Sequence, residues 1–271
     1  MSFAEPRDTV LITGASTGIG ATYADRLAQR GHPLILVARN QDRLQALAQR
    51  LTREYGVKTE VMMADLTQSQ DRLRVERRLG DDHTIGWLLN SAGMAVGTAI
   101  AEASPDTAES MIQLNIVAPT RLIGAMLPRL LARGRGSIIN IASVLALAPE
   151  LFDGAYGASK SYLLNYTLAL HKEAGHRGIR VQAVLPGITR TEIWQHTGGT
   201  PETIPPSTIM EVDEMVDAAL AGYDQGEVVT IPSLPDNEDW NRYVAARQRL
   251  MPSLSRDHAA DRYKSDIPED A

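Results

Sequence analysis

Short runs of apolar residues alternate along most of the chain with longer segments in which apolar residues recur every three or four positions. The short runs are nearly continuous in Val, Ile and Leu, which is typical of parallel strands buried on both faces. They predict strands at residues 9–13, 33–38, 57–64, 87–90, 137–143, 181–186 and 227–232. The longer segments predict helices, including residues 21–31, 40–56, 105–133 and 155–176.

This alternation predicts an α/β protein with a doubly wound parallel sheet and helices on both faces, built as one domain over residues 1–235. Two segments depart from this alternation of strand and helix patterns. Residues 187–215 begin with a stretch rich in Gly, Thr and Pro, which predicts a substrate lid. Residues 236–271 predict a helical extension that begins near Asp236 or Asn237 and packs on its own domain or on a neighbouring subunit.

Composition narrows the classes of partner. The chain has 271 residues, a length that suits a single α/β domain, and a net charge of −6, which argues against a nucleic-acid or anionic-membrane partner. It has no cysteine, so disulfides and thiolate metal sites are excluded, and we expect no metal. Neither a signal-peptide pattern nor an apolar run of about 18 residues is present. These features predict a cytoplasmic protein.

The first predicted strand leads directly into TGASTGIG, residues 13–20, and then into a helix. Glycines at 14, 18 and 20 suit a tight turn that needs positive φ or a close backbone approach. The amide N–H groups at the start of a helix behind such a turn can bind a pyrophosphate. A glycine-rich turn without a ligand is the alternative, but the position after the first strand favours dinucleotide binding.

The end of the second predicted strand indicates which dinucleotide binds. An acidic residue there would bind the ribose 2′-hydroxyl of NAD, but the strand ends in VARN, with Arg39 at that position. A guanidinium can bind a 2′-phosphate through two hydrogen bonds. The sequence therefore predicts NADP(H) in preference to NAD(H), with Ser16 and Arg43 as secondary candidates for the phosphate.

The stretch YGASK places Tyr156 and Lys160 four residues apart, on one face of a predicted helix. A nearby ammonium group would favour phenolate and lower the pKa of the tyrosine toward working pH. Such a tyrosine could give a proton to a carbonyl oxygen or take one from an alcohol. The pair alone is common on helices, so the assignment depends on other motifs.

Those motifs follow in order: ADL at 64–66, NSAG at 90–93, Asn115 within MIQLNIVAP, Ser143 thirteen residues before Tyr156, and LPGITRT at 185–191. Together with the glycine-rich turn and YGASK, they make residues 9–191 resemble the short-chain dehydrogenase/reductase family. The resemblance implies a Rossmann-like fold and a homodimer or homotetramer. The sequence departs from the family pattern at Ser91 of NSAG and in its long tail, which puts the family's tetramer contacts in doubt.

The resemblance implies hydride transfer between NADP(H) and a ketone or aldehyde, with catalytic residues Asn115, Ser143, Tyr156 and Lys160. Tyr156 would act as general acid, Ser143 would bond the same oxygen, Lys160 would bind the nicotinamide ribose, and Asn115 would help hold a water. The cofactor contacts implied are Gly14, Ser16, Thr17, Gly18, Ile19, Gly20, Arg39, Asp65, Leu66, Asn90, Ala92, Gly93, Tyr156, Lys160, Pro186, Gly187, Thr189 and Thr191.

Residues close to these motifs are mostly apolar, which predicts a substrate with a hydrophobic body. The predicted substrate contacts are Ser143, Leu145, Phe152, Tyr156, Ile193 and Trp194, with Met94, Leu147 and Ile188 beside them. Arg190 is the one candidate for a substrate carboxylate. Three alternatives stay open: an inactive NADP(H)-binding regulatory protein, an enzyme of the family that prefers NAD(H), and an epimerase or dehydratase on a related scaffold.

Overall fold

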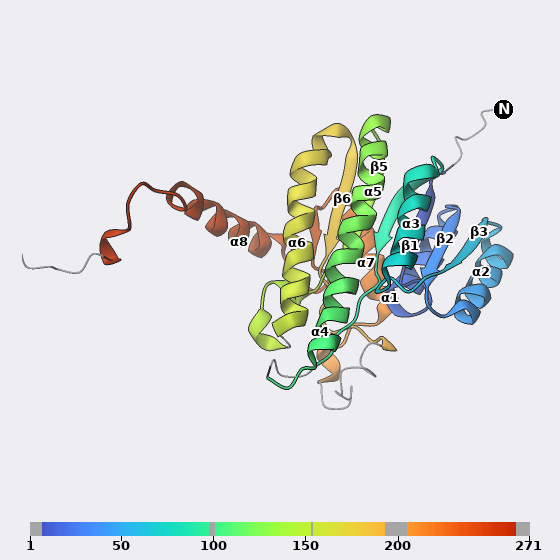
Figure 1. The fold of residues 1–271 in the computed structure, drawn as a ribbon, viewed down its shortest axis with the longest axis horizontal. Coiled ribbons are helices and arrows are strands. Elements are labelled where there is room, and N and C mark those ends of the chain that lie inside the picture. The colour runs from blue at the N-terminus through green and yellow to red at the C-terminus, as the bar shows by residue number, and fades with distance from the viewer. Residues whose placement is uncertain (1–6, 98–100, 153, 193–204, 264–271) are drawn as a thin grey trace, which may run out of the picture. The chain divides into compact units, whose positions relative to one another are not determined.

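The structure is a computed structural model that describes residues 7–97, 101–152, 154–192 and 205–263. Its centre is a seven-stranded sheet in the order β3-β2-β1-β4-β5-β6-β7, in which every neighbouring pair is parallel (Figure 1). The strands are β1 (Thr9–Thr13), β2 (Leu34–Ala38), β3 (Thr59–Met63), β4 (Ile85–Asn90), β5 (Gly136–Ile141), β6 (Ile179–Val184) and β7 (Val229–Thr230). The predicted doubly wound α/β fold is confirmed.

Helices cover both faces of this sheet. They are α1 (Gly18–Gln29), α2 (Gln41–Tyr55), α3 (Ser69–Asp81), α4 (Pro105–Ile112), α5 (Ala118–Arg133), α6 (Gly154–Ala174) and α7 (Val212–Gln225). Successive strand residues point to opposite faces, so Val10 and Ile12 pack with α1, α2 and α7, whereas Leu11 packs with α3, α5 and α6. Each face therefore has its own apolar core.

Helix α2 shows how the sequence sets the ends and the buried face of an element. The Asn40 side chain accepts a hydrogen bond from the Arg43 backbone N–H at 3.0 Å and caps the first turn. Leu44 and Leu51, two turns apart, are fully buried against the sheet. The helix ends at Gly56, whose φ of 68° is left-handed and accessible to glycine at no steric cost.

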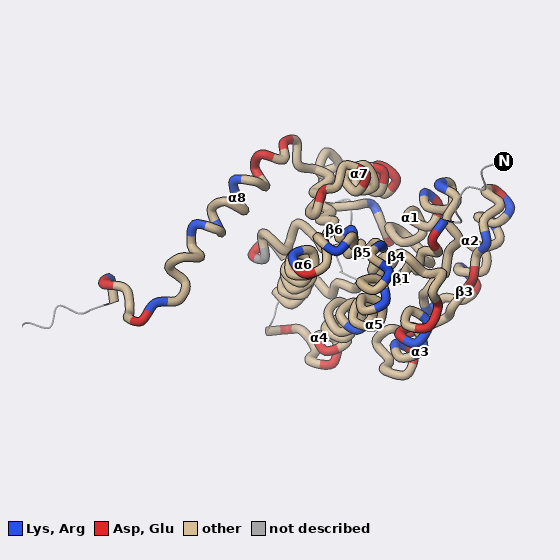
Figure 2. Tube along the Cα trace, turned by 90° about the horizontal axis from the view of Figure 1, so that it is seen from above, with Lys and Arg blue, Asp and Glu red and all other residues tan. Residues whose placement is uncertain are grey.

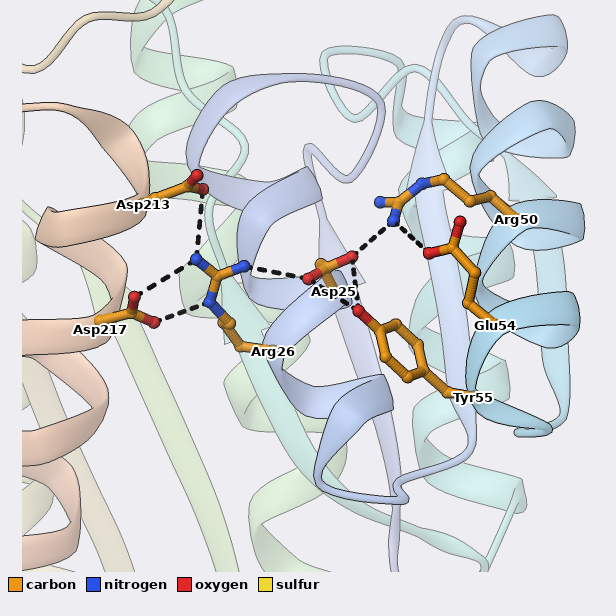
Figure 3. Close-up of polar contacts among 7 residues, drawn as sticks. All are labelled: Asp25, Arg26, Arg50, Glu54, Tyr55, Asp213 and Asp217. Carbon is orange, nitrogen blue, oxygen red and sulfur yellow. Dashed lines mark hydrogen bonds and ion pairs between the residues drawn. The ribbon is translucent and has the colours of Figure 1, made fainter.

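Charged residues lie mainly on the outer helices (Figure 2), and some of them join the helices of one face. The Asp25 carboxylate of α1 accepts hydrogen bonds from Arg50 of α2 at 2.6 Å and from Arg26 at 3.0 Å (Figure 3). Arg26 in turn donates from Nε to Asp217 of α7 at 2.7 Å. The network links α1, α2 and α7 through polar contacts.

Two predicted boundaries are wrong. The helix predicted over 105–133 is divided, because a π-helical turn at Gln113–Val117 separates α4 from α5. The predicted lid over 187–215 extends too far, since α7 begins at Val212 and Met215 is fully buried in the core. The polar composition of 187–209 hid the start of that helix. Residues 193–204 of the predicted lid lie outside the described residues.

The chain divides by its contacts into two units, Met1–Pro232 and Ser233–Ala271. The second unit contains helix α8 (Asn237–Leu250) and most of the predicted extension. The Asp236 side chain accepts a hydrogen bond from the Glu238 N–H at 2.8 Å, so the predicted N-cap is confirmed. Trp240 and Tyr243 stack with ring centroids 5.3 Å apart. In the described part of the chain, no helix is long and apolar enough to cross a membrane.

Candidate active site

The predicted site residues gather at the carboxyl edge of the sheet. The chain places β1 between β2 and β4, so the connections from β1 and from β4 leave on opposite sides of the sheet. Parallel sheets of this kind bind ligands at the carboxyl ends of the strands, where the strand order reverses. The glycine-rich turn follows β1, the NSAG segment begins at the end of β4, and Ser143 follows β5.

The glycine-rich turn packs too closely for side chains. A Cβ on Gly14 would lie 2.8 Å from the Ala92 backbone, and a Cβ on Gly20 would lie 2.3 Å from the Gly14 carbonyl oxygen. At the start of α1, Thr17 makes no capping hydrogen bond through its side chain, and the first turn has no acidic residue. The backbone N–H groups of that turn are thus open to an anion, which fits a dinucleotide pyrophosphate.

The end of β1 contains a residue that sequence reasoning missed. The Thr13 hydroxyl accepts hydrogen bonds from the N–H groups of Ser91 and Ala92, each at 3.1 Å, and so joins the glycine-rich turn to the NSAG segment. Nearby, the Asn90 amide donates to Asn140 at 2.8 Å, while the buried Asn90 Oδ1 has no partner among the described residues. Thr13 opens the quoted motif TGASTGIG, and that position was the available signal.

The predicted adenosine end lies beyond β2 and β3. Arg39 is exposed where β2 ends. Arg43, the secondary candidate, is instead ion-paired with Glu192 at 2.7 Å. The Asp65 carboxylate accepts from the N–H and the hydroxyl of Thr67, at 3.0 and 2.7 Å, which fixes the loop that follows β3. Both arginines are exposed, and Arg43 differs from Arg39 in that its guanidinium is already engaged by a carboxylate.

Three of the predicted catalytic side chains meet directly. Tyr156 and Lys160 lie on the first two turns of α6, and the Tyr156 hydroxyl shares a hydrogen bond with Ser143. Lys160 is buried and donates from Nζ to the Ile141 carbonyl oxygen at 2.8 Å, which leaves two of its protons for other acceptors. Its Nζ lies 5.5 Å from the centre of the Tyr156 ring. A phenol, a hydroxyl and an ammonium group are thus assembled at one place.

The pKa of Tyr156 is raised, not lowered as the sequence predicted. Burial raises the pKa of Tyr156 to about 12, although the hydrogen bond from Ser143 opposes this. Burial also lowers the pKa of Lys160 to about 8. The physical reason is desolvation, which disfavours the charged forms of both groups. At neutral pH Tyr156 is therefore a phenol with a proton to give.

Asn115 occupies the π-helical turn and is buried. Its Oδ1 accepts from the Met94 N–H at 3.0 Å, and its Nδ2 donates to the Met94 carbonyl at 2.9 Å and to the Ser159 hydroxyl at 3.0 Å. Both amide protons are thus used within the protein. The side chain acts as a bridge between segments, and a water linked to Asn115 would need another atom of this residue.

The segment after β6 lies over the glycine-rich turn. The Val144 N–H donates to the Pro186 carbonyl at 3.0 Å, which places this segment beside Ser143. A Cβ on Gly18 would lie 3.2 Å from Thr191 Cγ2, and Thr189 is buried. The predicted contacts at Pro186, Gly187, Thr189 and Thr191 therefore follow one another along the edge where Gly18 lies. Arg190 points elsewhere, since it is ion-paired with Glu211 at 2.7 Å.

Apolar side chains border the catalytic residues. The Phe152 ring meets the Tyr156 ring edge-on, with centroids 5.9 Å apart. Half-buried apolar residues, which keep some surface for a ligand, include Met94, Leu145, Leu147, Phe152 and Ile188. Two predicted substrate contacts, Ile193 and Trp194, lie outside the described residues. These apolar residues can therefore contact the apolar part of a ligand that lies next to the proton donor Tyr156.

Comparison with known proteins agrees with this arrangement. Residues 8–201 match the short chain dehydrogenase family. A short-chain dehydrogenase from Sphingobium yanoikuyae in complex with NADPH is 50% identical, with a TM-score of 0.92 over 95% of this chain and 100% of that one. A bulky-bulky ketone specific alcohol dehydrogenase from Comamonas testosteroni is 47% identical, with a TM-score of 0.87 over 95% of this chain and 99% of that one.

A more distant relative is the hydroxysteroid dehydrogenase-like protein 1 of Gallus gallus. It is 30% identical over 185 residues, which are 68% of this chain, and the match spans only 56% of the relative's own length. The family match covers well over half of the chain and includes every motif from the glycine-rich turn to LPGITRT. The chain therefore belongs to the short-chain dehydrogenase/reductase family of oxidoreductases.

Proposed function

We propose that this protein is an NADP(H)-dependent carbonyl reductase, or alcohol dehydrogenase in the reverse direction, for ketones or aldehydes with a largely hydrophobic body. The observation that carries the proposal is the contact of Tyr156 with Ser143 beside the buried Lys160. When bound, NADPH would supply the hydride that reduces the carbonyl carbon. What the chain must add is orientation, a proton, and stabilisation of the charge that forms on the oxygen.

Each of these tasks has a candidate group. Tyr156 holds its proton at neutral pH, because burial raises its pKa to about 12, and gives it to the carbonyl oxygen. The Ser143 hydroxyl hydrogen-bonds the same oxygen as negative charge develops there. Lys160 keeps one bond to the Ile141 carbonyl and offers its remaining protons to the nicotinamide ribose. Its positive charge also stabilises the phenolate that Tyr156 becomes once its proton has been given to the substrate.

The cofactor proposal rests on the turn that follows β1 and on Arg39. The uncapped start of α1 binds the pyrophosphate through backbone N–H groups. Arg39 binds the 2′-phosphate, which NAD(H) lacks. The bound NADPH in the Sphingobium yanoikuyae relative supports the choice of NADP(H). Arg43 contributes less, because Glu192 already neutralises it.

The substrate proposal rests on the apolar border of the site. Phe152 stands against the Tyr156 ring, so a group on the carbonyl carbon lies beside an aromatic wall. The preference of the Comamonas testosteroni relative, a bulky-bulky ketone specific enzyme, supports ketones with two large apolar substituents. We also propose a cytoplasmic homodimer or homotetramer that uses the face of α5 and α6, where the exposed Tyr162 stacks on Tyr166 at 5.7 Å.

The experiment is consumption of NADPH and NADH with a panel of aldehydes, aryl alkyl ketones and diaryl ketones, on wild type and Tyr156→Phe. Loss of the general acid is expected to lower kcat by about 10²–10⁴-fold. Tyr162→Phe is the matched control, because Tyr162 lies on the same helix and its hydroxyl meets Thr120 at 3.0 Å, not Ser143. Its rate should equal that of wild type.

Two results would contradict the proposal. Tyr156→Phe with the wild-type rate would remove Tyr156 from the chemistry. A wild type that binds NADPH, as seen by quenching of tryptophan fluorescence, but turns over no carbonyl or alcohol would favour a regulatory protein. The complete set of Asn115, Ser143, Tyr156 and Lys160 argues against that alternative, because a cofactor sensor needs no proton-transfer groups.

A further inference from the structure

Ser159 lies between Tyr156 and Lys160 on α6, and no motif argument assigned it a role. It is only 1% exposed. Its hydroxyl donates to the Tyr156 carbonyl oxygen at 2.7 Å, a bond that serines often make within helices. It also accepts a hydrogen bond at 3.0 Å from Nδ2 of Asn115, which is 44 residues away in the chain. The second bond ties α6 to a segment that is distant in the chain.

Through this hydroxyl, α6 is joined to two other segments of the site. Asn115 holds the Met94 backbone by both its N–H and its carbonyl group, at 3.0 and 2.9 Å. Ser159 is the partner of the remaining Asn115 amide proton. The chain of bonds therefore runs from the segment after β4, through the π-helical turn, to the backbone of Tyr156. These hydrogen bonds fix the position of the first turn of α6 along the helix axis and its rotation about that axis.

We propose that Ser159 is a positioning residue for proton transfer by Tyr156, an inference that rests on the proposed function. The hydroxyl acts through the Tyr156 backbone and places the phenol against Ser143, while Lys160, the next residue along the helix, keeps its bond to Ile141. Rates depend steeply on such placement, and a shift of about 1 Å can cost on the order of 10²-fold.

The test compares Ser159→Ala and Ser159→Thr with wild type, using a ketone that wild type reduces. Ser159→Ala is expected to lower kcat by about 10-fold or more, while the Kd for NADPH, measured by fluorescence, changes by less than about 2-fold. The solvent deuterium isotope effect on kcat should rise, because proton transfer from a displaced phenol becomes rate-limiting. Ser159→Thr keeps the hydroxyl and should recover most of the rate.

The chain offers a matched control on the same helix. The Thr167 hydroxyl, fully buried, donates to the Leu163 carbonyl at 2.6 Å and accepts from Nδ2 of Asn140 at 2.9 Å. Its bonding thus repeats that of Ser159, about three helical turns away from Tyr156. Thr167→Val should lower Tm about as much as Ser159→Ala but leave kcat and the isotope effect at wild-type values.

The outcomes separate the two proposals. An active wild type with Ser159→Ala at full rate, or with equal losses of kcat in Ser159→Ala and Thr167→Val, overturns the positioning role alone. If Ser159→Ala does not fold, Ser159→Cys fills the same space with a weak donor, and full activity of that variant overturns it too. A wild type that is inactive on every carbonyl and alcohol overturns the proposed function, and this inference with it.

Discussion

A buried lysine is the residue that most constrains this site. Lys160 is 5% exposed and donates to the Ile141 carbonyl, and no carboxylate of the described residues is paired with it. Burial alone lowers its pKa to about 8, so at neutral pH the protein holds an ammonium group without a counter-charge. Such a group lowers the free energy of unfolding, which is consistent with the role in catalysis that we propose for it.

Removing the ammonium group should therefore stabilise the protein without cofactor. The pKa of Lys160 is lower in the folded state than the ordinary 10.5, so the unfolded chain binds more protons, and stability rises with pH between about 8 and 10.5. Lys160→Met should raise the free energy of unfolding by up to roughly 3 kcal/mol at pH 7 and by about 1 at pH 10. Denaturant unfolding at both pH values measures the difference.

A constant difference between Lys160→Met and wild type across this pH range would show that the charge is not the cause. Lys58→Met is the control, since that lysine is exposed and lies outside the core between α2 and β3. Activity should be lost in Lys160→Met only. A single side chain would then lower the free energy of unfolding and yet be required for activity.

Much of the residue-scale site could be read from the sequence, because the motifs fix residue types at set spacings. Tyr156, Ser143 and Lys160 are brought together as the spacing indicated. The direction of the Tyr156 pKa could not be read, since burial depends on packing from the whole chain. Thr13 and Ser159 were missed for a related reason: their partners lie far away in sequence, and a lone hydroxyl in a motif gives no sign of them.

At the scale of elements, the turn between β1 and α1 is the connection that least tolerates added side-chain atoms. A methyl group on Gly20 would lie 2.3 Å from a backbone oxygen, which cannot move aside as a side chain could. Gly124, inside α5, is the opposite case, because nothing lies within 4 Å of its added Cβ and its φ is not left-handed. The two glycines differ only in what surrounds them.

Gly20→Ala should therefore lower the free energy of unfolding by about 1–3 kcal/mol and abolish NADPH binding, because the turn must open to admit the methyl group. Gly124→Ala should raise the free energy of unfolding by about 0.8–1.0 kcal/mol, the usual gain within an exposed helix. Urea unfolding with fluorescence titration of NADPH measures both. Equal effects of the two substitutions would mean that the turn is not closely packed in solution.

Element boundaries were predicted well where local signals exist. Two helices begin where the side chains of Asn40 and Asp236 cap them, and one helix ends at Gly56, which has no side chain to oppose a left-handed conformation. The division of residues 105–133 carries no such signal, because a π-helical turn is set by the packing of Asn115 against Met94 and Ser159. The start of α7 was missed because Val212 follows a polar, proline-rich stretch.

At the scale of the whole molecule, a preference for NADPH or NADH can be measured as a difference in the free energy of unfolding. A cofactor that binds only the folded state stabilises that state. NADPH at 100 times its Kd should add about 2.7 kcal/mol to the free energy of unfolding. The same concentration of NADH should add less, because no 2′-phosphate reaches Arg39. Thermal unfolding with each cofactor measures this preference directly.

Arg39→Ala should reduce the NADPH shift in Tm to that of NADH and leave the NADH shift unchanged. Arg43→Ala is the control and should have a smaller effect, because its guanidinium is already paired with Glu192 at 2.7 Å. Equal shifts with NADPH and NADH in wild type would instead point to an enzyme that prefers NAD(H), one of the readings that the sequence left open.

The sheet itself was predictable at this scale, because most of its strands are nearly continuous runs of Val, Ile and Leu, as expected of strands buried on both faces. The order β3-β2-β1-β4-β5-β6-β7 follows once the family is known, but no local pattern states which strands are neighbours. Pairings such as Val10 with Leu34 and with Trp87 join positions that are 24 and 77 residues apart. Only the complete fold brings them into register.

The π-helical turn at Gln113–Val117 has a consequence for anyone who would rebuild this protein. Such a turn holds one more residue than a regular α-helical turn, so a designer who straightens residues 105–133 into a regular α-helix without removing a residue would rotate everything on one side of it by about 100°. Asn115 would then leave both Met94 and Ser159. A transplanted or idealised version of this scaffold must therefore keep the π-helical turn. A straighter helix could be more stable, but it would lose these contacts of Asn115.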